Sequence, residues 1–143
     1  MSTDDRLIYL VFTAQQKLKT YLNNTLNSEG VTVTPAQAAI LFLLREKDGQ
    51  SMSALSQVLS MDNSTVTGLV DRLQKSGLVT RRANPDDRRV SLIRITPQGV
   101  EEIKKAKPVI TRVNEQIKAG LSDQEINTFK GILNSFFEKF HNG

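Results

Sequence analysis

Residues 53–99 decide the fold, and they read SALSQVLSMDNSTVTGLVDRLQKSGLVTRRANPDDRRVSLIRITPQG. The first part predicts two short amphipathic helices, one over 53–59 capped by Ser53 and one over 63–76 capped by Asp62. The second helix has a buried stripe at helical spacing, formed by Val66, Leu69, Val70 and Leu73. Two short helices joined by a tight turn predict a helix-turn-helix.

Small hydrogen-bonding side chains gather at the start of the second helix. They are Asn63, Ser64, Thr65 and Thr67. Short neutral groups let a helix sit deep in the major groove of DNA and touch base edges, and the helix N-terminus favours a phosphate. Arg72 and Lys75 follow on later turns, where they can reach the DNA backbone. An ordinary capped surface helix also begins with Ser and Thr. The segment that follows therefore has to distinguish a DNA-contacting helix from such a surface helix.

After Gly77 the period changes from helix to strand. Residues 78–82 and 90–96 predict two strands around a turn at 83–87, where Asn-Pro-Asp-Asp is typical of turns. Because two strands alone are marginally stable, this hairpin must lean on the helices before it. Its arginines are Arg81, Arg82, Arg88, Arg89 and Arg94. A basic hairpin directly after a helix-turn-helix predicts a winged helix, whose tip can reach the minor groove.

The charge distribution favours a polyanionic partner. The 143-residue chain has a formal net charge of +4, and residues 62–96 hold seven basic and four acidic residues, a net charge of +3. Six of those seven basic residues are arginine, whose planar fork suits phosphates and guanine edges. Asp87 lies among them. Its carboxylate either holds a neighbouring arginine in one rotamer or serves only to form the turn.

Longer helices flank this lobe on both sides. Apolar periodicity predicts a first helix over 5–26, and a capping box of Thr34 and Gln37 opens a nearly all-apolar helix. A fifth helix starts at Pro97, with a kink predicted at Pro108, and a Ser122–Glu125 capping box opens the last one. Bunched apolar side chains on the first and last helices favour a homodimer over burial within one subunit.

The composition argues against catalysis. The chain has no cysteine, which excludes thiol chemistry and disulfides, and its one histidine, His141, argues against a multi-histidine metal site. No glycine-rich phosphate loop or metal-ligand cluster is present in the sequence, and we expect no catalytic residue, no metal and no cofactor. The apolar run at 7–12 is too short to span a bilayer, which favours a cytoplasmic protein with no membrane segment.

Residues 53–99 resemble the multiple-antibiotic-resistance regulator (MarR) family of winged-helix transcription factors. The wing of that family carries Asp-x-Arg-x-x-x-(Val/Ile)-x-(Leu/Ile)-Thr, often followed by two residues and Gly. The matching positions here are Asp87, Arg89, Ile93, Ile95, Thr96 and Gly99. Residues 64–67, 69–73 and 77–79 also resemble the family's recognition helix and the strand after it. One departure is Gly68, where many relatives carry a basic residue.

The resemblance implies a mainly α protein, a winged helix-turn-helix with a two-stranded β-hairpin wing and long terminal dimerisation helices. We expect one domain over 1–143, with a DNA-binding lobe at 34–96 and dimerisation helices at 5–28 and 97–140. The expected DNA-binding residues are Asn63, Ser64, Thr65, Thr67, Arg72, Lys75, Arg81, Arg82, Asp87, Arg88 and Arg89.

The expected function is sequence-specific binding of double-stranded DNA by a homodimeric repressor of a palindromic operator. The resemblance further implies relief by a small phenolic or anionic ligand in a cleft beside the dimer helices. The alternative is a winged-helix protein-interaction module that does not read DNA. Such a module has no need for the arginine pairs at 81–82 and 88–89, which favours the regulator.

Overall fold

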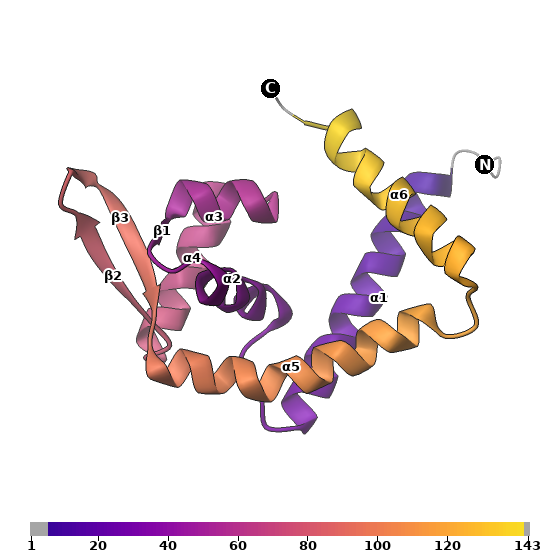
Figure 1. The fold of residues 1–143 in the computed structure, drawn as a ribbon, viewed down its shortest axis with the longest axis horizontal. Coiled ribbons are helices and arrows are strands. Elements are labelled where there is room, and N and C mark those ends of the chain that lie inside the picture. Colours follow the sequence, from indigo (N-terminus) through magenta and orange to yellow (C-terminus); the bar gives the residue numbers. More distant parts are fainter. Residues whose placement is uncertain (1–5, 142–143) are drawn as a thin grey trace. The chain divides into compact units, whose positions relative to one another are not determined.

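The computed structural model describes residues 6–141 (Figure 1). They fall into two compact units, one ending at Val109 and one beginning at Ile110. The elements in chain order are α1 (Leu7–Ser28), α2 (Pro35–Glu46), β1 (Gln50–Ser51), α3 (Met52–Leu59), α4 (Asn63–Lys75), β2 (Val79–Asn84), β3 (Asp87–Ile95), α5 (Pro97–Lys118) and α6 (Asp123–Lys139). The mainly α winged helix-turn-helix with a β-hairpin is therefore confirmed.

The core of the first unit is built around α2. Ile40, Leu41 and Leu44 of that helix are fully buried, as its nearly all-apolar sequence predicts. Its predicted capping box is also confirmed: the Gln37 amide donates to Thr34 Oγ1 at 3.2 Å, and the Thr34 amide donates to Gln37 Oε1 at 2.9 Å. The helix-turn-helix and the sheet bury side chains in the same core, among them Leu55, Val66, Val70, Leu73, Val79 and Ile93.

The sheet has three antiparallel strands in the order β1-β3-β2. Within the hairpin, Val79 pairs with Ile95 and Arg82 pairs with Leu92. The short strand β1 was not predicted; it pairs Gln50 with Ile93 and so ties the end of the α2 region to the wing. Two residues are too few to show a strand period, and their partner lies far along the chain.

The structure shifts two predicted boundaries. The cap of α3 is Ser51, whose hydroxyl accepts from the Ala54 amide at 3.1 Å, so the predicted cap at Ser53 is wrong. The wing strands run further toward the tip than the predicted 78–82 and 90–96, which leaves Pro85 and Asp86 as the turn. The pairing survives Asn-Pro at the tip because the ladder is irregular between Ala83 and Asn84.

The start of α5 is fixed to the lobe by two polar contacts. Thr96 Oγ1 donates to the Gly77 carbonyl at 2.7 Å and accepts from the Gly99 amide at 3.0 Å. The buried carboxylate of Glu102 accepts from the Thr32 amide at 2.6 Å and from its hydroxyl at 2.9 Å. These contacts join α5 to the residues just before α2 and just after α4. The helix continues through Pro108.

In the second unit, α6 begins with the predicted capping box. The Glu125 amide donates to Ser122 Oγ at 3.1 Å, and the Ser122 amide donates to Glu125 Oε1 at 2.9 Å. None of the described residues of α6 is buried. Phe136 and Phe140 meet edge to face, with ring centroids 5.7 Å apart.

Candidate nucleic-acid interface

The turn between α3 and α4 is held by side-chain hydrogen bonds. Ser60 closes α3 in the left-handed region, with φ of 54°. Asp62 caps α4 as predicted: its Oδ1 accepts from the Thr65 amide at 2.7 Å and from the Ser64 hydroxyl at 2.8 Å. These hydrogen bonds, the Thr65 amide first, lower the pKa of the Asp62 carboxyl below its ordinary value. The cap therefore stays ionised at neutral pH.

Two residues predicted to contact DNA are themselves part of this turn. Asn63 Oδ1 accepts from the hydroxyl of Ser56, a buried residue of α3, at 2.7 Å. The Thr67 hydroxyl donates to the Asn63 carbonyl at 2.8 Å. Asn63 thus links α4 to α3 through the oxygen of its side-chain amide. No local pattern indicates this contact, because Ser56 lies seven residues earlier on a different helix.

The solvent face of α4 lies opposite its buried stripe. Ser64, Gly68, Arg72 and Lys75 follow one another along that face at spacings of three and four residues. Arg72 and Lys75 are exposed in the last turn, and neither forms an ion pair with another residue of the range 6–141. The helix therefore presents its N-terminal amide and hydroxyl groups at one end and two uncommitted cations at the other.

An ion pair connects this helix to the wing. Arg81 Nη1 of β2 lies 2.9 Å from Asp71 Oδ1 of α4. Only 33% of the Arg81 side chain is exposed, against 91% for Arg89 at the tip. Asp71 was not among the predicted site residues, since the sequence does not place it beside β2. Arg81 is thus committed to a partner within the protein.

The tip of the wing carries the predicted aspartate–arginine pair. Arg89 Nε donates to Asp87 Oδ1 at 3.0 Å, and Arg89 Nη2 donates to Asp87 Oδ2 at 3.2 Å. The Arg89 amide also donates to Oδ1 at 3.1 Å, so one carboxylate fixes both the backbone and the guanidinium. The Arg89 side-chain hydrogen bond lowers the pKa of Asp87, and the carboxylate in turn raises the pKa of Arg89.

The remaining wing arginines of the prediction lie on the same hairpin. Arg82 and Arg88 are exposed and form no ion pair within the described part of the chain. Arg94 is different, because it lies near the base of the wing with Nη1 3.8 Å from Asp48 Oδ2. Figure 1 shows the β2–β3 hairpin projecting away from α3 and α4. Arg82, Arg88 and Arg89 are thus three exposed cations on one hairpin.

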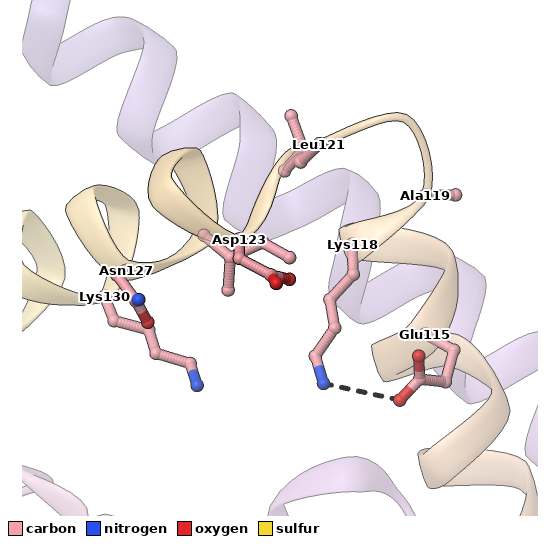
Figure 2. Close-up of a pocket in the computed structure, with 8 residues that line it drawn as sticks. Glu115, Lys118, Ala119, Leu121, Asp123, Asn127 and Lys130 are labelled. Carbon is pink, nitrogen blue, oxygen red and sulfur yellow. Dashed lines mark hydrogen bonds and ion pairs between the residues drawn. The ribbon is translucent and has the colours of Figure 1, made fainter.

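Surface hollows also lie outside this interface. One of about 370 Å³ between α2 and the start of α5 is lined by Phe42, Arg45, Glu46, Ile103, Lys104 and Lys107. Another, of about 580 Å³, lies at the turn from α5 to α6 (Figure 2). Lys118 in its lining already pairs with Glu115 at 3.4 Å. Among residues 6–141, no group of three acidic or histidine side chains could hold a metal ion.

Comparison with known proteins shows which family this architecture is similar to. The model of the MarR family matches residues 33–91. A putative transcriptional regulatory protein for the hcr operon of Thauera aromatica is 31% identical over 107 residues, which cover 75% of this chain and 64% of that protein. The chain thus spans less than two thirds of that relative's length.

Two solved structures cover nearly the whole chain. A probable transcriptional regulator from Pseudomonas aeruginosa is 33% identical, with a TM-score of 0.83, over 94% of this chain and 99% of that one. A MarR variant from E. coli in complex with operator DNA is 25% identical, with a TM-score of 0.82, over 94% and 98%. The proteins matched are transcriptional regulators and not enzymes. The chain belongs to the MarR family of winged-helix transcriptional regulators.

Proposed function

We propose that the chain is a homodimeric, sequence-specific DNA-binding repressor of a two-fold symmetric operator. One observation carries the proposal: Arg89 is 91% exposed at the wing tip and yet held by two side-chain hydrogen bonds to Asp87. A long cation fixed in open solvent stabilises the free protein very little. It is, however, already ordered for insertion into a narrow, electronegative groove.

In this proposal α4 enters the major groove. Ser64 and Thr65 at its first turn face base edges and the nearest phosphate, while Arg72 and Lys75 reach the backbone further along. Asn63 contributes through its amide nitrogen, since its oxygen is engaged by Ser56. Thr67 contributes through its hydroxyl oxygen as an acceptor, because its proton is given to the Asn63 carbonyl.

The wing supplies the flanking contacts. Arg89 enters the minor groove beside the region read by α4, and Arg82 and Arg88 contact phosphates on either side. Arg81 acts differently from its neighbours. Its ion pair with Asp71 keeps β2 against α4, so that one binding event places helix and wing in adjacent grooves.

A second copy of the chain completes the proposed regulator. Residues 7–12 of α1 form a run of exposed apolar side chains, with Ile8 85% exposed. On α6 the exposed stripe consists of Phe129, Ile132, Leu133, Phe137 and Phe140. A 17-residue helix with no buried residue gains little stability alone, which supports its being covered by a partner. We assign residues 34–96 to the DNA-binding lobe and the helices at 7–28 and 97–140 to dimerisation; residue 5 of the sequence-based range lies outside the described residues.

We place the small ligand of the proposal in the hollow between α2 and α5. Phe42 lines it together with Arg45, Lys104 and Lys107, which outnumber the single acidic residue of the lining, Glu46. Lys104 also pairs with Glu101 at 3.3 Å. That lining suits a small aromatic anion. Benzoate is a direct probe: it should weaken DNA binding by the wild type and have less effect on Arg45→Gln. Equal sensitivity of both proteins would remove this hollow from the proposal.

The test of the DNA-binding proposal is selection from random duplexes with the full-length chain. Recovery of a common sequence with two-fold symmetry supports a dimeric regulator, because each half-site then meets one copy of α4 and one wing. Recovery of DNA without any common sequence, or of none, contradicts it. Recovery of no DNA would favour the protein-interaction module, which keeps the winged-helix shape and does not read bases.

A further inference from the structure

Gly68 lies in the middle of α4, at the centre of its solvent face. Ser64 precedes it by four residues and Arg72 follows it by four, so the three form one row along the helix. Glycine is a poor residue for a helix interior, because it gives up more backbone freedom than alanine on folding. Such a glycine is expected where the backbone needs positive φ or where a neighbour leaves no room for a Cβ.

Neither reason applies to Gly68 in the free protein. Its backbone is helical, whereas the glycines with positive φ are Gly30, Gly49, Gly77 and Gly120. A Cβ built on Gly68 would meet no atom within 4 Å. By contrast, a Cβ on Gly99 would collide with the Leu78 carbonyl oxygen. The fold thus requires glycine at residue 99 and does not require it at residue 68.

We propose that Gly68 leaves space for a thymine methyl group on the floor of the major groove, so that Gly68 determines the base read at the centre of α4. The inference rests on the proposed function, in which this face of α4 enters the groove. The peptide groups of Gly68 lie within the helical hydrogen-bond ladder, so the residue offers only its Cα hydrogens. The thymine methyl is the one apolar group on a major-groove base edge, and it loses no hydrogen bond against such a surface.

Two of the side chains beside Gly68 are engaged elsewhere within the protein. The Ser64 hydroxyl donates to Asp62 Oδ1 at 2.8 Å, which directs it toward the helix start and away from Gly68. Asp71, on the adjoining row, is held by Arg81 at 2.9 Å. Ser64 and Asp71 beside Gly68 thus already have partners within the protein, whereas Arg72, four residues further along the row, forms no ion pair among the described residues.

The experiment adds a methyl group to the protein and removes one from the DNA. Gly68→Ala should raise the thermal unfolding midpoint by about 2–4 °C, since alanine favours the helix. The same change should weaken binding to the selected operator by roughly tenfold or more, which is the cost of one misfitted base contact. Replacing thymine by uracil at one position in each half-site should then restore most of the affinity of Gly68→Ala.

Gly131→Ala is the matched control. Gly131 also lies inside a helix with no atom within 4 Å of a built Cβ, on the side of α6 away from its phenylalanines. The Gly131→Ala variant should raise the thermal unfolding midpoint as Gly68→Ala does and should leave operator binding unchanged. This separates helix stabilisation from loss of contact.

Two results would overturn the inference while leaving the proposed function intact. One is operator binding by Gly68→Ala at wild-type affinity, which would mean that the space is unused. The other is weakened binding that no thymine-to-uracil replacement restores. Failure of the wild type to select any common sequence is a different result, because it removes the proposed function itself.

Discussion

Arg81 Nη1 and Asp71 Oδ1 lie 2.9 Å apart and join the wing strand β2 to the middle of α4. Arg82, the next residue along β2, has no such partner among the described residues and is exposed. Neighbouring arginines on one strand are therefore expected to serve different purposes. One positions the wing relative to α4, and the other meets the DNA backbone.

The salt dependence of DNA binding should separate these two purposes. Arg82→Gln removes a phosphate contact from each subunit, so the slope of log affinity against log salt should fall by about two per dimer. Arg81→Gln should weaken binding with a nearly unchanged slope, because the Arg81 guanidinium forms an ion pair with Asp71 and contacts no phosphate. Titrations of both variants on one operator at several salt concentrations make the comparison. Equal losses of slope would show that Arg81 is also a phosphate contact.

A variant that exchanges the charges of Asp71 and Arg81 is a control for the role of this ion pair in positioning the wing. Asp71→Arg combined with Arg81→Asp restores an opposite-charge pair across the same two positions. It should recover part of the affinity that either single change loses, whereas additive losses would show that the two residues act independently.

Asp87→Ala should weaken operator binding, although it removes a negative charge from the proposed DNA surface. Bulk electrostatics alone predicts tighter binding for this change. The carboxylate, however, holds the Arg89 guanidinium through two hydrogen bonds, and without it the side chain must be ordered at the moment of contact. Binding titrations of Asp87→Ala and Arg89→Ala at two salt concentrations test this. Tighter binding by Asp87→Ala, with unchanged stability, would leave the aspartate as a turn former.

Phe137→Glu should convert the proposed dimer to a monomer. Phe137 is 63% exposed on the apolar stripe of α6, and a charge there cannot be buried against a second copy without a large penalty. Asn127→Glu places the same charge on the polar side of α6 and serves as the control. Sedimentation at micromolar concentration should give about twice the chain mass for the wild type and the control. A wild-type monomer that still binds a palindrome tightly would contradict the dimer.

Stability should fall as the solution is acidified through the range in which the capping carboxylates titrate. The hydrogen bonds of the folded protein lower the pKa of Asp62 below its ordinary value of 3.8 and that of Glu125 below 4.5. Their stabilisation is complete above those ordinary values and is lost as pH falls through the lower folded-state values, because the unfolded chain then binds more protons. Thermal unfolding between about pH 6 and about pH 3 measures it. Asp62→Asn, which still caps, should show a smaller decline; an identical decline would remove Asp62 as a contributor.

Local signals in the sequence were sufficient for most of the fold. The caps at Thr34, Asp62 and Ser122 were predicted because a cap depends on residues three positions apart. The same locality explains why the sequence offered a neighbouring arginine as one of the two roles of Asp87, the role that the contact with Arg89 matches. The cap of α3 was misplaced by two residues, since Ser51 and Ser53 offer the same chemistry and only the backbone distinguishes them.

The contacts that the sequence did not indicate all join one element or loop of the fold to another. Strand β1 pairs with β3, Glu102 reaches Thr32, Ser56 reaches Asn63, and Asp71 reaches Arg81. Each depends on how helices pack, and no spacing along one helix or strand encodes that packing. These contacts matter for the site, because they decide which polar atoms of α4 and the wing stay available to a partner.

The most direct test of DNA reading is the ratio of two dissociation constants, measured with the full-length wild type at a single salt concentration of about 0.15 M. One duplex carries the selected operator, and the other is a scrambled duplex of the same length and composition. The proposed arrangement of α4 and the wing predicts that the operator binds at least about a thousandfold more tightly. A ratio near one, measured on protein shown to be folded, would contradict it.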